Sequence, residues 1–156
     1  MTTGIEISEL RDMQEAGLAA RWIFDAWARF ESDETWQANR RDIELALNPT
    51  VQMPKFFAAR VDGEVAGIAS IVPHDLPIRP ALGPWLANVL VQPQWRRRGI
   101  GGKLVQCMMD YARPIARPLY LYTFDRADLY QRLGWQVMEA DRYLGRPITI
   151  MRFPAA

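Results

Sequence analysis

Three consecutive arginines run directly into a stretch with three glycines, in residues 96–102 of the sequence. The segment follows an apolar run that ends at Val91 and precedes a helical pattern, so it lies where a helix is expected to begin. A helix N-terminus leaves four backbone N–H groups without partners in the helix and carries about half a positive charge. Glycines let an anion approach that backbone, and arginine pairs well with phosphate oxygens. The segment therefore predicts a cradle for phosphate.

The two common nucleotide-phosphate motifs do not fit this segment. A Walker A loop needs a glycine five positions before its Gly-Lys pair and a Ser or Thr after it, but Arg97 and Leu104 occupy those places. A dinucleotide fingerprint counted from Gly99 and Gly101 needs a third glycine where Leu104 stands. The sequence therefore predicts a phosphate ligand of another class.

Length and composition are those of one ordinary globular domain. The chain has 156 residues, of which 49% are hydrophobic and 24% charged. The net charge is +1, from 19 basic and 18 acidic residues, so any basic binding surface must be local. The single cysteine, Cys107, excludes an intrachain disulfide and a cysteine metal cluster. No secretory signal or apolar run of the ~18 residues that span a bilayer is present, so we expect a cytoplasmic protein.

Helical and strand patterns are interleaved along the chain. We expect helices at residues 13–27, 34–47, 100–111 and 126–133, and strands at 5–10, 56–61, 65–72, 85–91, 119–123, 135–138 and 148–153. Asp62-Gly63 predicts a hairpin, because glycine supplies the positive φ of a tight turn. The continuous apolar run at 85–91 predicts a strand buried on both faces. Together these patterns predict an α/β (α+β mixed) fold, a mixed sheet with helices on both faces.

The pattern Arg-x-x-Gly-x-Gly, after a strand that ends Val-x-Pro, resembles the acetyl-CoA signature of the GNAT family of N-acetyltransferases. DLPIRPALGPWLANVLVQP resembles the family's fourth strand and its approach, LYLYTFDRADLYQRLGW resembles the fifth strand and the next helix, and ITIMRF resembles the last strand. The likeness covers residues 56–153 well and the two N-terminal helices loosely. It implies one GNAT domain over residues 1–156, with a mostly antiparallel sheet whose fourth and fifth strands splay apart.

The resemblance also implies a donor and a set of site residues. The donor would be acetyl-CoA, with no metal, and the acceptor a primary amine of a small molecule or peptide that attacks directly, without an acyl-enzyme. Backbone groups would hold the pantetheine arm, and the arginine–glycine segment the phosphates. The implied donor-binding residues are Leu90, Val91, Arg96, Arg97, Arg98, Gly99, Ile100, Gly101, Gly102 and Thr123. Tyr130 aligns with the tyrosine that assists departure of the thiolate, although it could instead simply pack on the sheet.

Amine acetylation requires a base that the predicted fourth strand does not supply. A lysine-like amine has a pKa of about 10.4, so roughly one molecule in a thousand or fewer is neutral at pH 7. Many relatives place an acid on that strand, whereas its only polar side chain here is Asn88. His74 and Asp75 in the preceding loop, and Glu31 and Asp33 between the first two helices, remain open candidates.

Several alternatives stay open on the sequence. The missing acid favours a non-catalytic acetyl-CoA sensor as one alternative, and the run WRRR favours a nucleic-acid-binding module as another, although the near-zero net charge counts against the second. The loops near the acceptor hold both signs of charge, so the acceptor class and the oligomeric state, including a homodimer, stay open. Cys107 is expected in the core. The aromatic residues Trp22, Trp27, Phe30 and Trp36 are expected mostly in the core, with one or two lining an acceptor pocket.

Overall fold

The computed structural model describes residues 4–116 and 118–153, so residues 1–3 and 154–156 of the domain expected from the sequence lie outside the described part. Its elements in chain order are β1 (Ile5–Glu9), α1 (Met13–Ala26), the 3-10 turn η1 (Ala28–Phe30), α2 (Asp33–Leu45), β2 (Lys55–Val61), β3 (Glu64–Val72), β4 (Trp85–Val91), the 3-10 turn η2 (Pro93–Trp95), α3 (Ile100–Ala112), β5 (Leu119–Thr123), α4 (Ala127–Arg132), β6 (Gln136–Tyr143) and β7 (Arg146–Phe153).

Seven strands form one sheet in the order β1-β2-β3-β4-β5-β7-β6. Every neighbouring pair is antiparallel except β4 and β5, which are parallel. Parallel neighbours need a long crossover, and the connection through α3 supplies it. The α/β class and the mixed, mostly antiparallel sheet expected from the sequence are confirmed.

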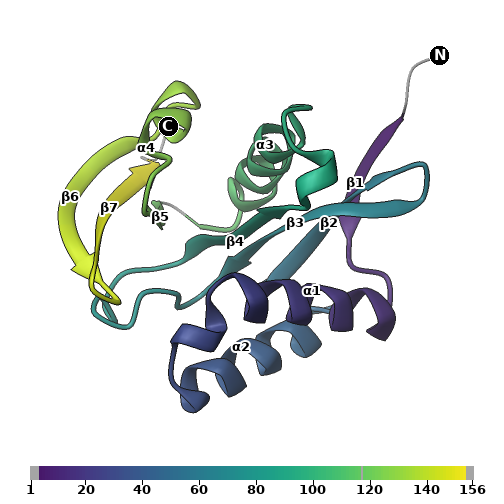
Figure 1. Cartoon of the computed structure of the whole chain (residues 1–156), viewed down its shortest axis with the longest axis horizontal. Coiled ribbons are helices and arrows are strands. Elements are labelled where there is room, and N and C mark those ends of the chain that lie inside the picture. The colour runs from purple at the N-terminus through teal and green to yellow at the C-terminus, as the bar shows by residue number, and fades with distance from the viewer. Residues whose placement is uncertain (1–3, 117, 154–156) are drawn as a thin grey trace.

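Helices cover both faces of the sheet, as expected (Figure 1). The helices α1 and α2 lie on one face, and α3 and α4 lie on the other. Each face has its own apolar core: Ile23 and Ile43 from α1 and α2 belong to one, and Leu104 and Met108 from α3 belong to the other. Within the described part of the chain, no helix is long and apolar enough to cross a membrane.

Local sequence explains where several elements begin and end. The side chains of Asp12 and Ser32 cap α1 and α2 by accepting hydrogen bonds from backbone N–H groups of the first turn. Asp62 and Gly63 both have positive φ and turn β2 into β3, which confirms the hairpin. Glycine is required at position 67 for another reason, because a Cβ there would lie 2.8 Å from the Leu90 carbonyl oxygen.

A buried cation ties the N-terminal elements to the sheet. The guanidinium of Arg60 on β2 donates two hydrogen bonds to the Glu15 carboxylate of α1, at 2.6 and 2.9 Å. It also donates to the Ser8 hydroxyl on β1. The Arg60 side chain is 1% exposed, and its hydrogen bond to Glu15 holds the pKa of that carboxyl below its usual value. The pair therefore fixes α1 over the β1–β2 edge.

Four expectations were wrong. Only the first half of β4 is buried, whereas the residues from Asn88 onward are half-buried because they line the site described below. None of the four aromatic residues expected mostly in the core is fully buried. Three are half-buried and pack against one core, namely Trp22, Trp27 and Trp36, and Phe30 is exposed in the short turn between α1 and α2. Cys107 is half-buried and belongs to neither core, because it lies beside the buried face of α3. The strand β6 runs to Tyr143 and turns at Leu144-Gly145, both with positive φ, a turn that the sequence analysis missed.

Candidate functional site

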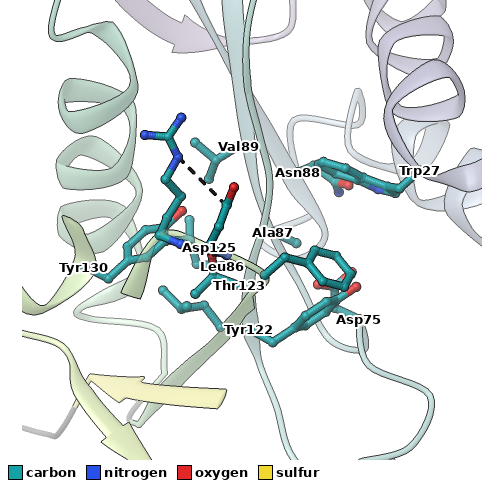
Figure 2. A pocket seen from close by; sticks show the side chains of 13 residues that line it. Trp27, Asp75, Leu86, Ala87, Asn88, Val89, Tyr122, Thr123, Asp125 and Tyr130 are labelled. Carbon is teal, nitrogen blue, oxygen red and sulfur yellow. Dashed lines mark hydrogen bonds and ion pairs between the residues drawn. The ribbon is translucent and has the colours of Figure 1, made fainter. Parts of the chain in front are cut away.

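Strands β4 and β5, which are parallel neighbours in the sheet, are paired at a single position. Trp85 of β4 is registered with Tyr120 of β5, and the Tyr120 N–H donates to the Pro84 carbonyl at 3.0 Å. Beyond that point a cavity of about 240 Å³ lies between the two strands, here called the central cavity. Its lining residues are Trp27, Asp75, Leu86, Ala87, Asn88, Val89, Leu121, Tyr122, Thr123, Phe124, Asp125, Arg126 and Tyr130. Figure 2 shows Tyr130 reaching it from one side and Trp27 and Asp75 from the other.

A bulge in β4 shapes the wall of the central cavity. Asn88 has a φ of 57°, and the register with β3 shifts there, so that two β4 residues oppose one on β3. The Asn88 amide donates to the Ser70 hydroxyl at 3.0 Å, and that hydroxyl donates to the Ala87 carbonyl. Asn88 therefore holds the bulge in place, and an amide is no base.

A larger groove opens on the α3 side of the sheet, with a volume of about 690 Å³. We call it the α3-side groove. Its lining residues are Val89, Leu90, Val91, Trp95, Arg96, Arg97, Gly99, Ile100, Gly101, Asp125, Arg126, Leu129 and Tyr130. It shares Val89, Asp125, Arg126 and Tyr130 with the central cavity, so the two spaces adjoin. Three arginines against one aspartate make this groove basic.

The start of α3 differs from the starts of α1 and α2. Gly99 occupies the N-cap with a φ of 77° and no side chain caps the helix. The first intrahelical bond runs from the Lys103 N–H to the Gly99 carbonyl, so the N–H groups of Ile100 and Gly101 have no partner within the helix. Arg97 also has positive φ, a strained conformation for a non-glycine residue that is common at functional sites. The start of α3 therefore leaves backbone donors without partners in the helix, a geometry that can bind an anion.

Not every residue of the arginine–glycine segment lies in the groove. Arg96 lines it, and its Nε donates to the Val91 carbonyl at 3.0 Å, which ties the loop to the end of β4. Arg98 does not line it; its guanidinium lies 5.0 Å from the centre of a Trp95 ring. Gly102 does not line it either. Arg96 and Arg97 are therefore the side chains placed to contact an anion.

Tyr130 of α4 lies where the groove meets the central cavity, and it lines both. The residue is 8% exposed and packs edge-on against Trp135. Burial raises the pKa of Tyr130 to about 12, so the phenol stays protonated at neutral pH. Among the residues that the structure describes, none forms a hydrogen bond with its hydroxyl. The phenol can therefore donate to a group placed in either space.

Thr123 ends β5 and begins the turn into α4. Its hydroxyl accepts hydrogen bonds from the N–H groups of Arg126, at 2.9 Å, and of Asp125. This cap fixes the segment that carries Tyr130. Thr123 lines the central cavity rather than the α3-side groove.

A third space, of about 360 Å³, opens on the other side of the central cavity between α2 and the β3–β4 loop. We call it the α2-side cavity. It is lined by Trp27, Glu31, Glu34, Thr35, Ala38, Asn39, Asp42, Pro73, His74, Asp75, Leu76, Pro77, Pro80 and Tyr122. Four are carboxylic acids, and none of these described lining residues is lysine or arginine. The sequence suggested mixed charge here, and the difference arises because Arg40 and Arg41 on α2 do not face the cavity.

The four candidate bases from the sequence lie at different places in the structure. Asp75 lines both the α2-side and central cavities, whereas Glu31 and His74 line only the first, and Asp33 lines neither. Burial is the main cause that raises the pKa of Glu31, and a hydrogen bond from the Tyr143 hydroxyl at 2.7 Å opposes it. Burial also raises the pKa of Asp42. Tyr122, which the sequence analysis missed, lines both spaces with Trp27.

The three spaces form a continuous series with opposite charge at its two ends. The basic α3-side groove suits an anionic phosphate ligand. The acidic α2-side cavity suits a molecule that carries positive charge. Between them, the central cavity offers a phenol donor from one side and a carboxyl group from the other. Such an arrangement can bring two different substrates together for transfer of a group.

A sequence model of a family, described as an acetyltransferase (GNAT) domain, matches residues 53–137. The match runs from just before β2 into the start of β6 and so includes the anion cradle, Asp75 and Tyr130. No curated protein matches the chain.

Solved structures share the whole fold at low sequence identity. An acetyltransferase of the GNAT family from Streptococcus pneumoniae superposes with a TM-score of 0.71, is 19% identical and covers 98% of this chain and 100% of its own. An aminoglycoside 6'-N-acetyltransferase complexed with coenzyme A gives 0.69 at 17% identity, covering 97% of each chain. An acyl-CoA N-acyltransferase from Pseudomonas aeruginosa gives 0.67 at 17% identity, covering 97% of this chain and 99% of that one.

Proposed function

Since the family match spans more than half of its residues, the chain belongs to the GNAT acetyltransferase family, and we propose that it transfers the acetyl group of acetyl-CoA to a primary amine. The observation that carries the proposal is the uncapped start of α3, which faces a basic groove leading to the central cavity. An anionic donor fits that end of the series, and an amine acceptor fits the other.

Donor binding is assigned to the α3-side groove. The backbone N–H groups at the start of α3 would bind the pyrophosphate, because they lack partners within the helix. Arg96 and Arg97 would pair with the outer phosphates. Leu90 and Val91 line the groove next to Val89, which also lines the central cavity, and their backbone groups would hold the pantetheine arm.

The acceptor nitrogen would attack the thioester carbonyl directly, within a complex of both substrates. An acyl-enzyme needs a nucleophile in the cavity, and Cys107, the only cysteine of the chain, lines none of the three spaces. Burial, with a contribution from Asp110, also raises the pKa of its thiol, so the thiolate is disfavoured. The hydroxyl of Thr123 already accepts hydrogen bonds from two backbone N–H groups.

Tyr130 would assist departure of the thiolate as a hydrogen-bond donor. Full proton transfer from a phenol of pKa about 12 to a thiolate whose acid has a pKa of ~8.5 would be uphill by about 5 kcal/mol. A hydrogen bond to the developing negative charge has no such cost and stabilises the transition state. Tyr130 is therefore assigned the role of donor to sulfur.

Two-substrate kinetics test this proposal. Initial rates of thiol release are measured while acetyl-CoA and an amine are both varied, and the acetylated amine is identified by its mass. A complex of both substrates gives double-reciprocal lines that intersect, whereas parallel lines would contradict direct attack. Since one similar structure is an aminoglycoside 6'-N-acetyltransferase, aminoglycosides belong in the amine panel. Donor binding without thiol release for any amine would instead support a non-catalytic sensor.

A further inference from the structure

Three residues line both the central cavity and the α2-side cavity, namely Trp27, Asp75 and Tyr122. Any acceptor that enters from the α2 side must pass them to reach the thioester. Asp75 is the one of the three whose side chain exchanges a proton near neutral pH, since an indole does not and burial raises the pKa of the Tyr122 phenol further above its usual value. Figure 2 shows Asp75 beside Tyr122 at this junction.

The surroundings of Asp75 raise the affinity of its carboxylate for a proton. Within the described residues, its side chain has no hydrogen-bond or ion-pair partner. Asp75 is half-buried, and desolvation, followed by the charges of Glu31 and Asp42, raises its pKa to about 8. Tyr122 and Tyr143 are the phenols influenced by its charge, and His74 is the adjacent titratable group on the same loop.

Nearby arginines do not neutralise this site. Arg79, on the same loop, forms ion pairs with Glu139 and Asp141 of β6. The guanidinium of Arg146 lies 4.1 Å from the centre of the Phe124 ring. No group of three or more His, Cys, Asp or Glu side chains in the described chain could hold a metal ion. The acidic lining is therefore available to an organic cation.

We propose that Asp75 is the general base of the reaction and that the acceptor reaches it as a cationic amine through the α2-side cavity. The inference rests on the proposed function, because it assigns a proton acceptor to that same transfer. The other acids fit the role less well. Glu31 does not line the central cavity and accepts from Tyr143, and Asp125 is a largely exposed residue on the donor side beside Arg126.

The protons and bonds of the step balance. The ammonium group gives one proton to the Asp75 carboxylate, and the resulting neutral nitrogen attacks the thioester carbonyl carbon. A C–N bond forms and the C–S bond breaks, with the electron pair leaving on sulfur beside the Tyr130 hydroxyl. The second nitrogen proton goes to the thiolate, directly or through water, and Asp75 returns its proton to solvent. The net products are the N-acetylated amine, coenzyme A and one proton.

The pH dependence of the Asp75→Asn variant tests the assignment. For wild type, kcat/KM should rise with pH through an ionisation near 8 and then level off. In the variant, the amine must lose its proton in water, so kcat/KM should rise about tenfold per pH unit toward the amine pKa of ~10.4. The deficit of the variant should be about 10²-fold or more at pH 7 and should shrink with pH. A purely structural role for Asp75 would not produce this convergence.

Three controls accompany the variant. Asp25→Asn changes an exposed aspartate of α1 that lines none of the three spaces, so its pH profile of kcat/KM should match that of wild type. Asp42→Asn removes a charge that helps to raise the Asp75 pKa, so in this variant the ionisation seen in kcat/KM should occur at lower pH than in wild type. Affinity for coenzyme A, measured by calorimetry, should be the same in Asp75→Asn and wild type, because Asp75 does not line the α3-side groove.

The acceptor class is tested in the same assay with spermidine, n-butylamine and glutamate. Spermidine should give the highest kcat/KM and glutamate the lowest, because the α2-side cavity is acidic. A wild type that turns over amines while Asp75→Asn matches it at every pH would overturn the inference and leave the proposed function standing. Preference for glutamate would overturn the cationic acceptor. A wild type that binds coenzyme A but acetylates no amine would overturn both.

Discussion

Gly101→Asp should abolish tight binding of the donor without weakening the fold. Gly101 lies in the first turn of α3 and lines the α3-side groove. An added Cβ would meet its nearest neighbour, Val91 Cγ2, at 3.7 Å, which is an ordinary contact, so the helix can carry a side chain at this position. A carboxylate in a first helical turn also favours the helix dipole, typically by 0.3–1 kcal/mol. The fold should therefore be as stable as that of wild type, or slightly more so.

The loss of affinity follows from Coulomb's law. With about 4 Å between the new carboxylate and a donor phosphate oxygen, and an effective dielectric constant of about 20, the repulsion is about 4 kcal/mol. That corresponds to an increase in Kd of about 10³-fold. Calorimetric titration with coenzyme A measures the Kd, and thermal unfolding measures the stability.

Gly102→Asp is the matched control for this change. It adds the same charge to the same helical turn, but Gly102 does not line the groove, and nothing lies within 4 Å of its added Cβ. Its effect on Kd should be at least tenfold smaller than that of Gly101→Asp. Equal affinities for Gly101→Asp and wild type, at equal stability, would refute the anion cradle.

Three further variants test other parts of the account. Tyr130→Phe should lower kcat about 10²-fold and leave the Kd for coenzyme A unchanged, whereas normal turnover would return Tyr130 to a packing role beside Trp135. Glu15→Ala should reduce the free energy of unfolding by about 3 kcal/mol, because it leaves the buried Arg60 guanidinium without its main partner. Since the pKa of Glu15 is lowered in the folded protein, this stabilisation should be present above pH ~4.5 and be lost as the pH falls through the lower folded pKa. A difference in urea unfolding between the two proteins that does not change with pH would count against the pair. Gly67→Ala should destabilise the protein by about 1–3 kcal/mol, since a Cβ would lie 2.8 Å from the Leu90 carbonyl oxygen, and an unchanged Tm would show that β3 and β4 can separate freely.

Features encoded in one short segment could be predicted from the sequence. The bounds of β4 and β5, the hairpin at Asp62-Gly63 and the glycine start of α3 each depend on neighbouring residues, and all three agree with the structure. The succession of strand, glycine-containing loop and helix at residues 85–112 belongs to this class, because these elements follow one another directly in the chain; anion binding there remains a proposal.

Features formed by distant segments could not be predicted in this way. Trp27, Asp75 and Tyr122 meet at one junction although they come from α1, the β3–β4 loop and β5. The bulge at Asn88 depends on the register with β3, which a single strand does not reveal. The acidic character of the α2-side cavity depends on which side of α2 faces the sheet, and this separates Asp42 from its neighbour Arg41.

The most direct test of the central claim is thiol release from acetyl-CoA by the wild-type protein across amino acids, polyamines, aminoglycosides and peptides with free N-termini. We predict amine-dependent release, strongest with polycationic acceptors, together with one equivalent of N-acetylated product. An absence of amine-dependent release across the panel, in protein shown by calorimetry to bind coenzyme A, would contradict the claim that this chain catalyses acetyl transfer.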